Sequence, residues 1–238
     1  KTGRPAKMRL DRDDDMVMTG KRHDFIVEYD VGFDDDGRIC GLDIRYAANC
    51  GFSADLSAAI CDRAMFHTDN AYFLGDVEIR SYRCKTNLVS NTAFRGFGGP
   101  QGMVAIERII DEIAMTIGRD PLDVRIVNYY GTTDRNTTPY HMTVEDNVLA
   151  ELTNDILASC DYRKRREEID AFNAQSPVIK RGISITPVKF GISFTTTFLN
   201  QAGALIHIYQ DGSVHLNHGG TEMGQGLFIK VAQVVAEE

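Results

Sequence analysis

The stretch that decides the fold is Gly96-Phe-Gly-Gly-Pro-Gln-Gly-Met-Val-Ala-Ile-Glu-Arg-Ile-Ile-Asp-Glu-Ile-Ala-Met-Thr-Ile-Gly118. A glycine-rich turn at 96–102 leads directly into apolar residues that recur at alternating spacings of three and four: Met103, Ile106, Ile110, Ile113 and Ile117. This period is typical of an amphipathic helix with one face on a core. Gly118 is expected to end that helix, and Asp120-Pro121 to begin a second, short helix that ends near Asn128.

The segments on either side predict further helices and several strands. Two β-rich runs flank the turn at Asp36-Gly37 and indicate a hairpin within residues 23–50, and the run 56–67 is predicted to be a short helix. Residues 131–139 are expected to form a surface loop and 144–173 to be helical. From Lys180 onward the pattern predicts strands at 182–190, 204–209 and 213–218, with a turn at Asp211-Gly212, and a helix that starts at Leu227. The class expected is α+β, with mixed and antiparallel strands and flanking helices.

Composition narrows the functional classes. The chain has 238 residues with 34 acidic and 26 basic side chains, a formal net charge of −8, which argues against nucleic acid as a partner. No apolar run approaches the ~18 residues of a membrane span. Five cysteines without a Cys-x-x-Cys pair favour reduced thiols and a cytoplasmic protein. Because the chain starts without Met or an apolar signal and stops inside a predicted helix, we expect a fragment of a longer polypeptide.

Two glycine-rich turns, 96–102 and 219–226, each lead into a predicted helix. Unpaired N–H groups at a helix start and close backbone approach at glycine make both turns candidate cradles for an anion or a cofactor. Neither turn fits Gly-x-Gly-x-x-Gly or a P-loop, so ordinary nucleotide sites are disfavoured. Taken alone, the glycines are explained equally well by tight turns without a ligand.

The wider sequence resembles the molybdopterin-binding part of the xanthine dehydrogenase/aldehyde oxidase family. The strings that carry the resemblance are 90–101 (Ser-Asn-Thr-Ala-Phe-Arg-Gly-Phe-Gly-Gly-Pro-Gln), 189–195 and 219–226, with support from 1–5, 10–16, 63–72 and 198–204. The resemblance implies part of a two-domain molybdopterin-binding region, with a first segment at 1–145. Residues 146–238 would then be a helical linker and the start of a second segment.

The resemblance also implies roles for residues that face the substrate. Arg63 matches a catalytic arginine that binds a substrate carbonyl, which suits a guanidinium because its forked donors stabilise developing negative charge. Its structural alternative is an ion pair with Asp62 or with another carboxylate. Phe97 and Phe194 match phenylalanines that sandwich a flat ring, and Thr195 matches a residue that hydrogen-bonds the substrate.

A second group of residues matches positions that contact the cofactor. Arg95 matches a position whose backbone N–H approaches the molybdenum, while Met223, Gly224 and Gln225 match the stretch that hydrogen-bonds the pterin. The neutral amide of Gln225 suits that role because it both donates and accepts. The resemblance places Glu222 in the cofactor loop without a catalytic role. His67 and His218, which adjoin matched strings, are expected to be structural.

The activity implied is oxidative hydroxylation of hypoxanthine and xanthine to urate by a molybdenum hydroxylase. Electrons would pass to iron-sulfur clusters and FAD on other segments or subunits, in a hetero-oligomer. The family's general-base glutamate falls outside this chain, so the isolated chain is expected to be inactive. Two alternatives stay open: an aldehyde oxidase-type hydroxylase, in which the arginine at position 63 is commonly replaced by a nonpolar residue, and a catalytically silent fragment that docks partners.

Overall fold

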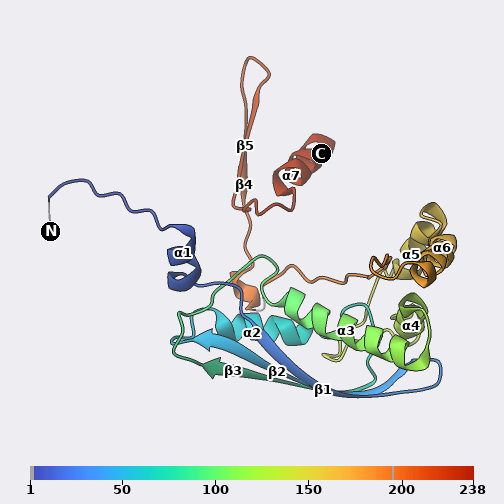
Figure 1. The fold of residues 1–238 in the computed structure, drawn as a ribbon. Coiled ribbons are helices and arrows are strands. Elements are labelled where there is room, and N and C mark those ends of the chain that lie inside the picture. The colour runs from blue at the N-terminus through green and yellow to red at the C-terminus, as the bar shows by residue number, and fades with distance from the viewer. Residues whose placement is uncertain (1–2, 195) are drawn as a thin grey trace. The chain divides into compact units, whose positions relative to one another are not determined.

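The computed structural model describes residues 3–194 and 196–238. The chain forms two compact units, Lys1–Phe190 and Gly191–Glu238. The first contains a three-stranded sheet with helices on one face, and the second contains a hairpin and a helix (Figure 1).

The sheet of the first unit has the strand order β1-β2-β3. Strands β1 (Phe25–Phe33) and β2 (Ile39–Gly51) are antiparallel and pair Tyr29 with Ile44, which confirms the predicted hairpin. Gly37 turns the chain between them with φ of +81°. Strand β3 (Asp76–Lys85) runs parallel to β2, and helix α2 (Ser57–Phe66) makes the crossover. Alternate residues of β1 are shielded, as the period of two requires for a sheet with one covered face.

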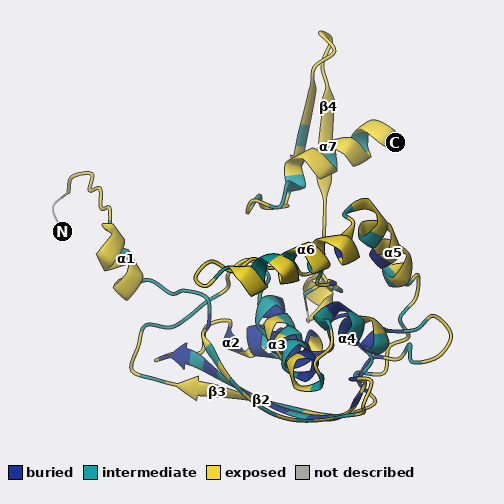
Figure 2. Ribbon diagram, turned by 45° about the vertical axis from the view of Figure 1, so that its right-hand side comes forward, coloured by how far each residue is buried: buried dark blue, intermediate teal, exposed yellow. Residues whose placement is uncertain are grey.

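Helices α2, α3 (Gly99–Ile117) and α4 (Pro121–Asn128) form as the sequence predicts. Gly118 ends α3 in the left-handed conformation, and the Asp120 side chain accepts from the N–H of Leu122 at the start of α4. Figures 1 and 2 show α2 and α3 against one face of the sheet, with buried residues gathered on α3 and β2. The apolar stripe of α3 thus forms the core with β2: Ile106, Ile109, Ile110, Ile113, Leu42, Ile44 and Tyr46.

The remaining helices of this unit are α1 (Arg12–Met18), α5 (Leu149–Ser159) and α6 (Tyr162–Gln175). The predicted helical stretch 144–173 is therefore two helices. The first starts at Leu149, and Cys160 and Asp161 separate it from the second. Helix α1, which the sequence analysis did not predict, carries no buried residue (Figure 2).

The second unit contains a short 3₁₀ turn (Thr197–Leu199), strands β4 (Ala204–Ile208) and β5 (Val214–His218), and helix α7 (Leu227–Glu237). The two strands pair antiparallel around Asp211-Gly212, where Gly212 has φ of +81°. Both the hairpin and the helix confirm the prediction.

One predicted strand is wrong and one strand was missed. Residues 182–190 run as irregular chain, because no neighbouring strand pairs with them and Pro187 lacks a backbone donor. Strand β3 was not anticipated: charged residues interrupt its apolar positions, and its parallel pairing with β2 needs a crossover that no local turn signal indicates. The α+β class with mixed strands is confirmed. Within the described ranges, no helix is both long and apolar enough to cross a bilayer.

Candidate functional site

The side chain of Arg63, near the end of α2, lies between two aromatic rings. Its guanidinium carbon is 5.8 Å from the centroid of the Phe97 ring and 5.7 Å from that of Phe190. Arg63 is only 5% exposed, and burial lowers the pKa of its guanidinium. Arginine still keeps its charge at neutral pH, because its ordinary pKa is above ~12. The structure therefore brings together Arg63 and Phe97, two of the predicted substrate residues, and adds Phe190.

Asp62, one of the partners expected for Arg63 in a purely structural role, pairs with a different arginine. The carboxylate of Asp62 forms its ion pair with Arg83 of β3. A histidine side chain stabilises the end of α2: the Nδ1–H of the buried His67 donates to the Arg63 carbonyl oxygen at 2.9 Å. Burial lowers the pKa of His67, which favours the neutral ring. His67 is therefore a structural residue, as expected, and it fixes the backbone from which Arg63 extends.

Phe97 belongs to a turn that packs on α2. Phe97 and Gly98 both have positive φ, of +51° and +96°. A β-carbon on Gly98 would lie 2.0 Å from the carbonyl oxygen of Ile60, and one on Gly102 would lie 2.2 Å from that of Ala64. These glycines thus allow the start of α3 to touch the backbone of α2. Their first role is close packing between helices, which the sequence alone could not separate from a ligand cradle.

Phe190 was not predicted as a site residue, and the residues just before it are held by hydrogen bonds. The N–H of Lys189 donates to the Asn70 side-chain oxygen at 3.0 Å, and the Asn70 amide donates to the Pro187 carbonyl at 3.0 Å. The Lys189 ammonium pairs with Asp69, which is 1% exposed. The Phe190 ring then lies 4.9 Å from that of His67.

Asp69 is the buried charge in this anchor. Its carboxylate accepts from the Tyr130 hydroxyl at 2.6 Å as well as from Lys189. Burial raises the pKa of Asp69, and the neighbouring Lys189 opposes that shift. Because an unpaired buried carboxylate is costly, Lys189 is required at this position whenever Asp69 is ionised.

Arg95 has an exposed side chain, and its backbone is held from outside the turn. The Arg22 guanidinium donates to the Arg95 carbonyl oxygen at 2.7 Å and lies 4.5 Å from the centroid of the Phe94 ring. The peptide at position 95 is therefore fixed by a contact that the sequence did not reveal.

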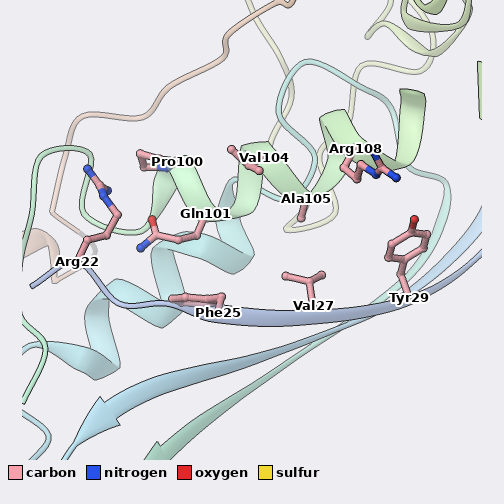
Figure 3. A pocket seen from close by; sticks show the side chains of 9 residues that line it. All are labelled: Arg22, Phe25, Val27, Tyr29, Pro100, Gln101, Val104, Ala105 and Arg108. Carbon is pink, nitrogen blue, oxygen red and sulfur yellow. The ribbon is translucent and has the colours of Figure 1, made fainter. Parts of the chain in front are cut away.

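Arg22 also lines an apolar groove of about 380 Å³ between β1 and α3. Figure 3 shows Phe25, Val27 and Tyr29 rising from the strand toward Val104, Ala105 and Arg108 of the helix. None of the predicted site residues lines this groove.

In the second unit, the turn at 219–226 directs its backbone donors toward a carboxylate. Gly224 and Gly226 have φ of +94° and +75°. Their N–H groups donate to Glu222 Oε1 at 2.7 and 3.1 Å, and the N–H of Phe228 donates to Oε2. Although slight burial raises the pKa of Glu222, these backbone donors lower it overall. Glu222 thus accepts backbone donors at the start of α7.

Gln225 uses its side-chain amide within the same turn. Its Oε1 accepts from the N–H of Met223 at 2.6 Å, and its Nε2 donates to the Thr221 carbonyl at 2.8 Å. His218 likewise accepts from the N–H of Gly220 at 3.0 Å. The three predicted cofactor residues Met223, Gly224 and Gln225 therefore lie in one turn whose shape the glutamine amide defines.

A cleft of about 880 Å³ adjoins this turn, and small residues form much of its lining: Gln201, Ala202, Gly203, Ala204, His218, Gly219, Gly220, Leu227 and Val231. β-Carbons on Gly203 and Gly219 would meet nothing within 4 Å, so the backbone is open on that side. A volume of this size accommodates a cofactor the size of a pterin. The cleft therefore has room for a flat ligand beside the turn.

The last two predicted substrate residues also belong to the second unit. The Asn200 side-chain oxygen accepts from the N–H of Phe194 at 2.7 Å, and its amide donates to the Phe194 carbonyl at 2.9 Å, so that backbone is firmly held. Thr195 lies outside the described residues. The sandwich of Phe97 with Phe194 stays a prediction.

Curated relatives match nearly the whole chain. The chain is 50% identical over 236 residues to a xanthine dehydrogenase/oxidase of Gallus gallus, which covers 99% of this chain and 17% of that protein. It is 48% identical over 233 residues to xanthine dehydrogenase 1 of Arabidopsis thaliana, covering 98% of this chain and 17% of that protein. The chain thus spans about a sixth of the length of these relatives.

Solved structures share the fold. An aldehyde oxidoreductase of Desulfovibrio desulfuricans matches with a TM-score of 0.73 and 25% identity, over 91% of this chain and 23% of that one. Quinoline 2-oxidoreductase of Pseudomonas putida matches with a TM-score of 0.70 and 21% identity, over 95% of this chain and 30% of that one, and shows the fold alone.

Family models assign both parts of the sequence. Residues 1–129 and residues 155–238 each match a model described as a molybdopterin cofactor-binding domain. The predicted boundary after residue 145 falls between the two matches and stays a prediction. Together the two matches cover most of the chain, which belongs to the molybdopterin cofactor-binding domain family.

Proposed function

We propose that this chain forms the purine-binding wall and part of the cofactor cradle of a molybdenum hydroxylase that converts hypoxanthine and xanthine to urate. The observation that carries the proposal is Arg63, a buried guanidinium flanked by the rings of Phe97 and Phe190. The relatives named xanthine dehydrogenase support the same assignment.

Arg63 would be the catalytic residue contributed by this chain. When bound, the molybdenum cofactor supplies the oxygen-transfer and two-electron redox chemistry. The Arg63 guanidinium would hold a purine carbonyl through its forked donors and stabilise the negative charge that develops there. Its nearly complete burial strengthens that interaction, because a charge-assisted hydrogen bond gains when water is excluded.

The remaining substrate contacts would set the plane of the ring. Phe97 and Phe194 offer aromatic faces to a heteroaromatic substrate, and Thr195 would donate or accept one hydrogen bond. The positive φ of Phe97 presents its ring from a turn that α2 holds in place. Phe97 and Arg63 therefore keep a fixed spacing, which suits a rigid bicyclic substrate.

The cofactor would be held by backbone groups and by one amide. The backbone N–H of Arg95 would face the molybdenum centre, and Met223, Gly224 and Gln225 would hydrogen-bond the pterin. The cleft next to the 219–226 turn supports this placement. To bind the pterin, the Gln225 amide would exchange a contact within its own turn for one to the ligand.

The complete enzyme would contain further parts. Electrons would leave through iron-sulfur clusters and FAD on other segments or subunits of a hetero-oligomer, and the general-base glutamate would come from outside these 238 residues. The isolated chain is accordingly expected to be inactive. A cytoplasmic location belongs to the same proposal and is supported by the five free cysteines.

An aldehyde hydroxylase is the second candidate, and the structural likeness to an aldehyde oxidoreductase favours it. A simple aldehyde has no second carbonyl for Arg63 to hold, so the buried arginine favours a purine.

The test is to purify the complete enzyme, measure its molybdenum content, and compare urate formation from xanthine with oxidation of an aromatic aldehyde. The proposal predicts stoichiometric molybdenum and a much higher kcat/KM for xanthine. A higher value for the aldehyde would favour the second candidate, and loaded enzyme inactive on both substrates would indicate a docking role.

A further inference from the structure

Arg63 has a second aromatic neighbour to which no role has been assigned. Phe97 and Phe190 lie at nearly equal distances from the guanidinium, 5.8 and 5.7 Å. They come from opposite sides in sequence, one from the turn before α3 and the other from the irregular segment after α6. Phe190 is 39% exposed, so its position is not explained by core packing alone.

We propose that Phe190 is a positioning residue that holds the Arg63 guanidinium in the orientation that binds a purine carbonyl. The Lys189–Asp69 ion pair in turn anchors Phe190. This inference rests on the proposed function.

Hydrogen bonds and an ion pair anchor the backbone that precedes Phe190. The segment 187–190 pairs with no strand, yet Asn70 binds it with both ends of its side-chain amide. The amide oxygen accepts from the N–H of Lys189, and the amide nitrogen donates to the Pro187 carbonyl. Asn70 is itself held because its amide also donates to Glu107 of α3 at 2.9 Å. The Lys189–Asp69 ion pair adds a buried charge contact next to these bonds. The backbone at position 190 is thus fixed by groups from the end of α2 and from α3.

The Phe190 ring packs between Gly99 and His67. A β-carbon on Gly99 would lie 2.5 Å from Cε2 of Phe190, so the ring fills the space that glycine leaves at the start of α3. On its other side the ring lies 4.9 Å from that of His67, at the end of α2. Phe190 therefore lies between the end of α2, the helix that carries Arg63, and the start of α3, which follows the turn that carries Phe97.

The Phe190 ring restricts the conformations that the Arg63 side chain can adopt. A guanidinium ends a long side chain with several rotatable bonds, and holding one rotamer costs entropy. Two aromatic neighbours reduce that freedom and attract the cation. Removing one face frees the guanidinium to move without changing its charge. The expected defect is therefore specific to substrates that Arg63 holds.

The experiment uses the complete enzyme with Phe190→Leu, Phe190→Tyr and the control Phe172→Leu. Phe172 also pairs with an arginine, Arg181 at 3.8 Å, but on α6. Each variant is assayed with xanthine and with an aromatic aldehyde, and rates are corrected for molybdenum content. Phe190→Leu should lower the ratio of the two kcat/KM values roughly 5- to 30-fold, the size of a partly desolvated cation–aromatic contact. Phe190→Tyr should keep the ratio, and so should Phe172→Leu.

A second arm separates positioning from general damage. In an Arg63→Met background, adding Phe190→Leu should lower the ratio no further, since Phe190 acts through Arg63. Equal losses on both substrates, or a full additional loss in the double variant, would overturn the proposal.

An activity-independent arm keeps this inference separate from the proposed function. Mass spectrometry would follow modification of Arg63 by phenylglyoxal. The buried guanidinium should react slowly in the wild type and in Phe190→Tyr, and faster in Phe190→Leu. If xanthine is not a substrate but this pattern holds, the proposed function fails and Phe190 still positions Arg63. If the rates are equal, the positioning role fails even though xanthine is hydroxylated.

Discussion

Gly98 packs against Ile60 so closely that a β-carbon at position 98 would lie 2.0 Å from the Ile60 carbonyl oxygen. Ile60 is on the helix that carries Arg63, and Gly98 directly follows Phe97. The close approach of these two backbones is therefore what sets the spacing of the cation and the ring in the candidate site.

Gly98→Ala should destabilise the protein by more than about 3 kcal/mol, because it adds a backbone clash to the cost of a positive φ. Gly118→Ala is the matched control: Gly118 also has positive φ, +68°, but a β-carbon there would meet nothing within 4 Å. That variant should lose only about 1–2 kcal/mol. Denaturant unfolding of both proteins measures the difference, and equal losses would show that the contact with Ile60 is unimportant.

The second prediction concerns Arg125, which is 2% exposed and forms ion pairs with Glu107 and Asp111 at 2.8 Å. Arg125→Met should cost about 3–5 kcal/mol, because it leaves the shielded carboxylate of Glu107 without a cation beside it. Arg108→Met removes an i,i+4 pair with Glu112 on the same helix, where the arginine is 63% exposed, and should cost less than about 1 kcal/mol. Similar midpoints for the two variants in urea would contradict the buried network.

Stability should fall as the pH is lowered through the histidine range. His23 is buried, its Nε2 contacts the Ser57 hydroxyl at 2.7 Å, and burial lowers its pKa. The unfolded chain then binds more protons below its own value of ~6.5, so this contribution is present above that pH and is lost as the pH falls toward the folded pKa. The slope of unfolding free energy between neutral pH and pH ~5 should flatten in His23→Asn. An unchanged slope would mean that His23 takes up its proton without opposing the fold.

The sequence predicted those parts of the fold that local signals specify. The 3-4 period of α3, the stop at Gly118 and the cap at Asp120 all lie within a few residues of the element they define. The segment 182–190 has equally good strand composition, yet a strand also needs a neighbour, and here Asn70 provides the hydrogen bonds instead. Long-range pairing of this kind leaves no trace in a local pattern.

Some residues of the candidate site could likewise be predicted from the sequence, and others could not. Family resemblance pointed to Arg63 and Phe97, and the structure places them together. Phe190 lies within the string 189–195 that carries the resemblance, but no role was predicted for it, because its anchors, Asp69 and Asn70, are distant in sequence. Its place in that string is the signal that could have drawn attention to this residue.

The measurement that tests the account most directly is the effect of Arg63→Met in the complete enzyme on kcat/KM for xanthine and for an aromatic aldehyde. A charge-assisted hydrogen bond contributes on the order of 1.5–3 kcal/mol, so xanthine hydroxylation should fall roughly 10- to 150-fold at unchanged molybdenum content. Aldehyde oxidation should change little or rise, because the aldehyde has no second carbonyl for the guanidinium to hold. Equal losses on the two substrates would contradict the account and would mean that Arg63 supports the structure of the site without reading the purine.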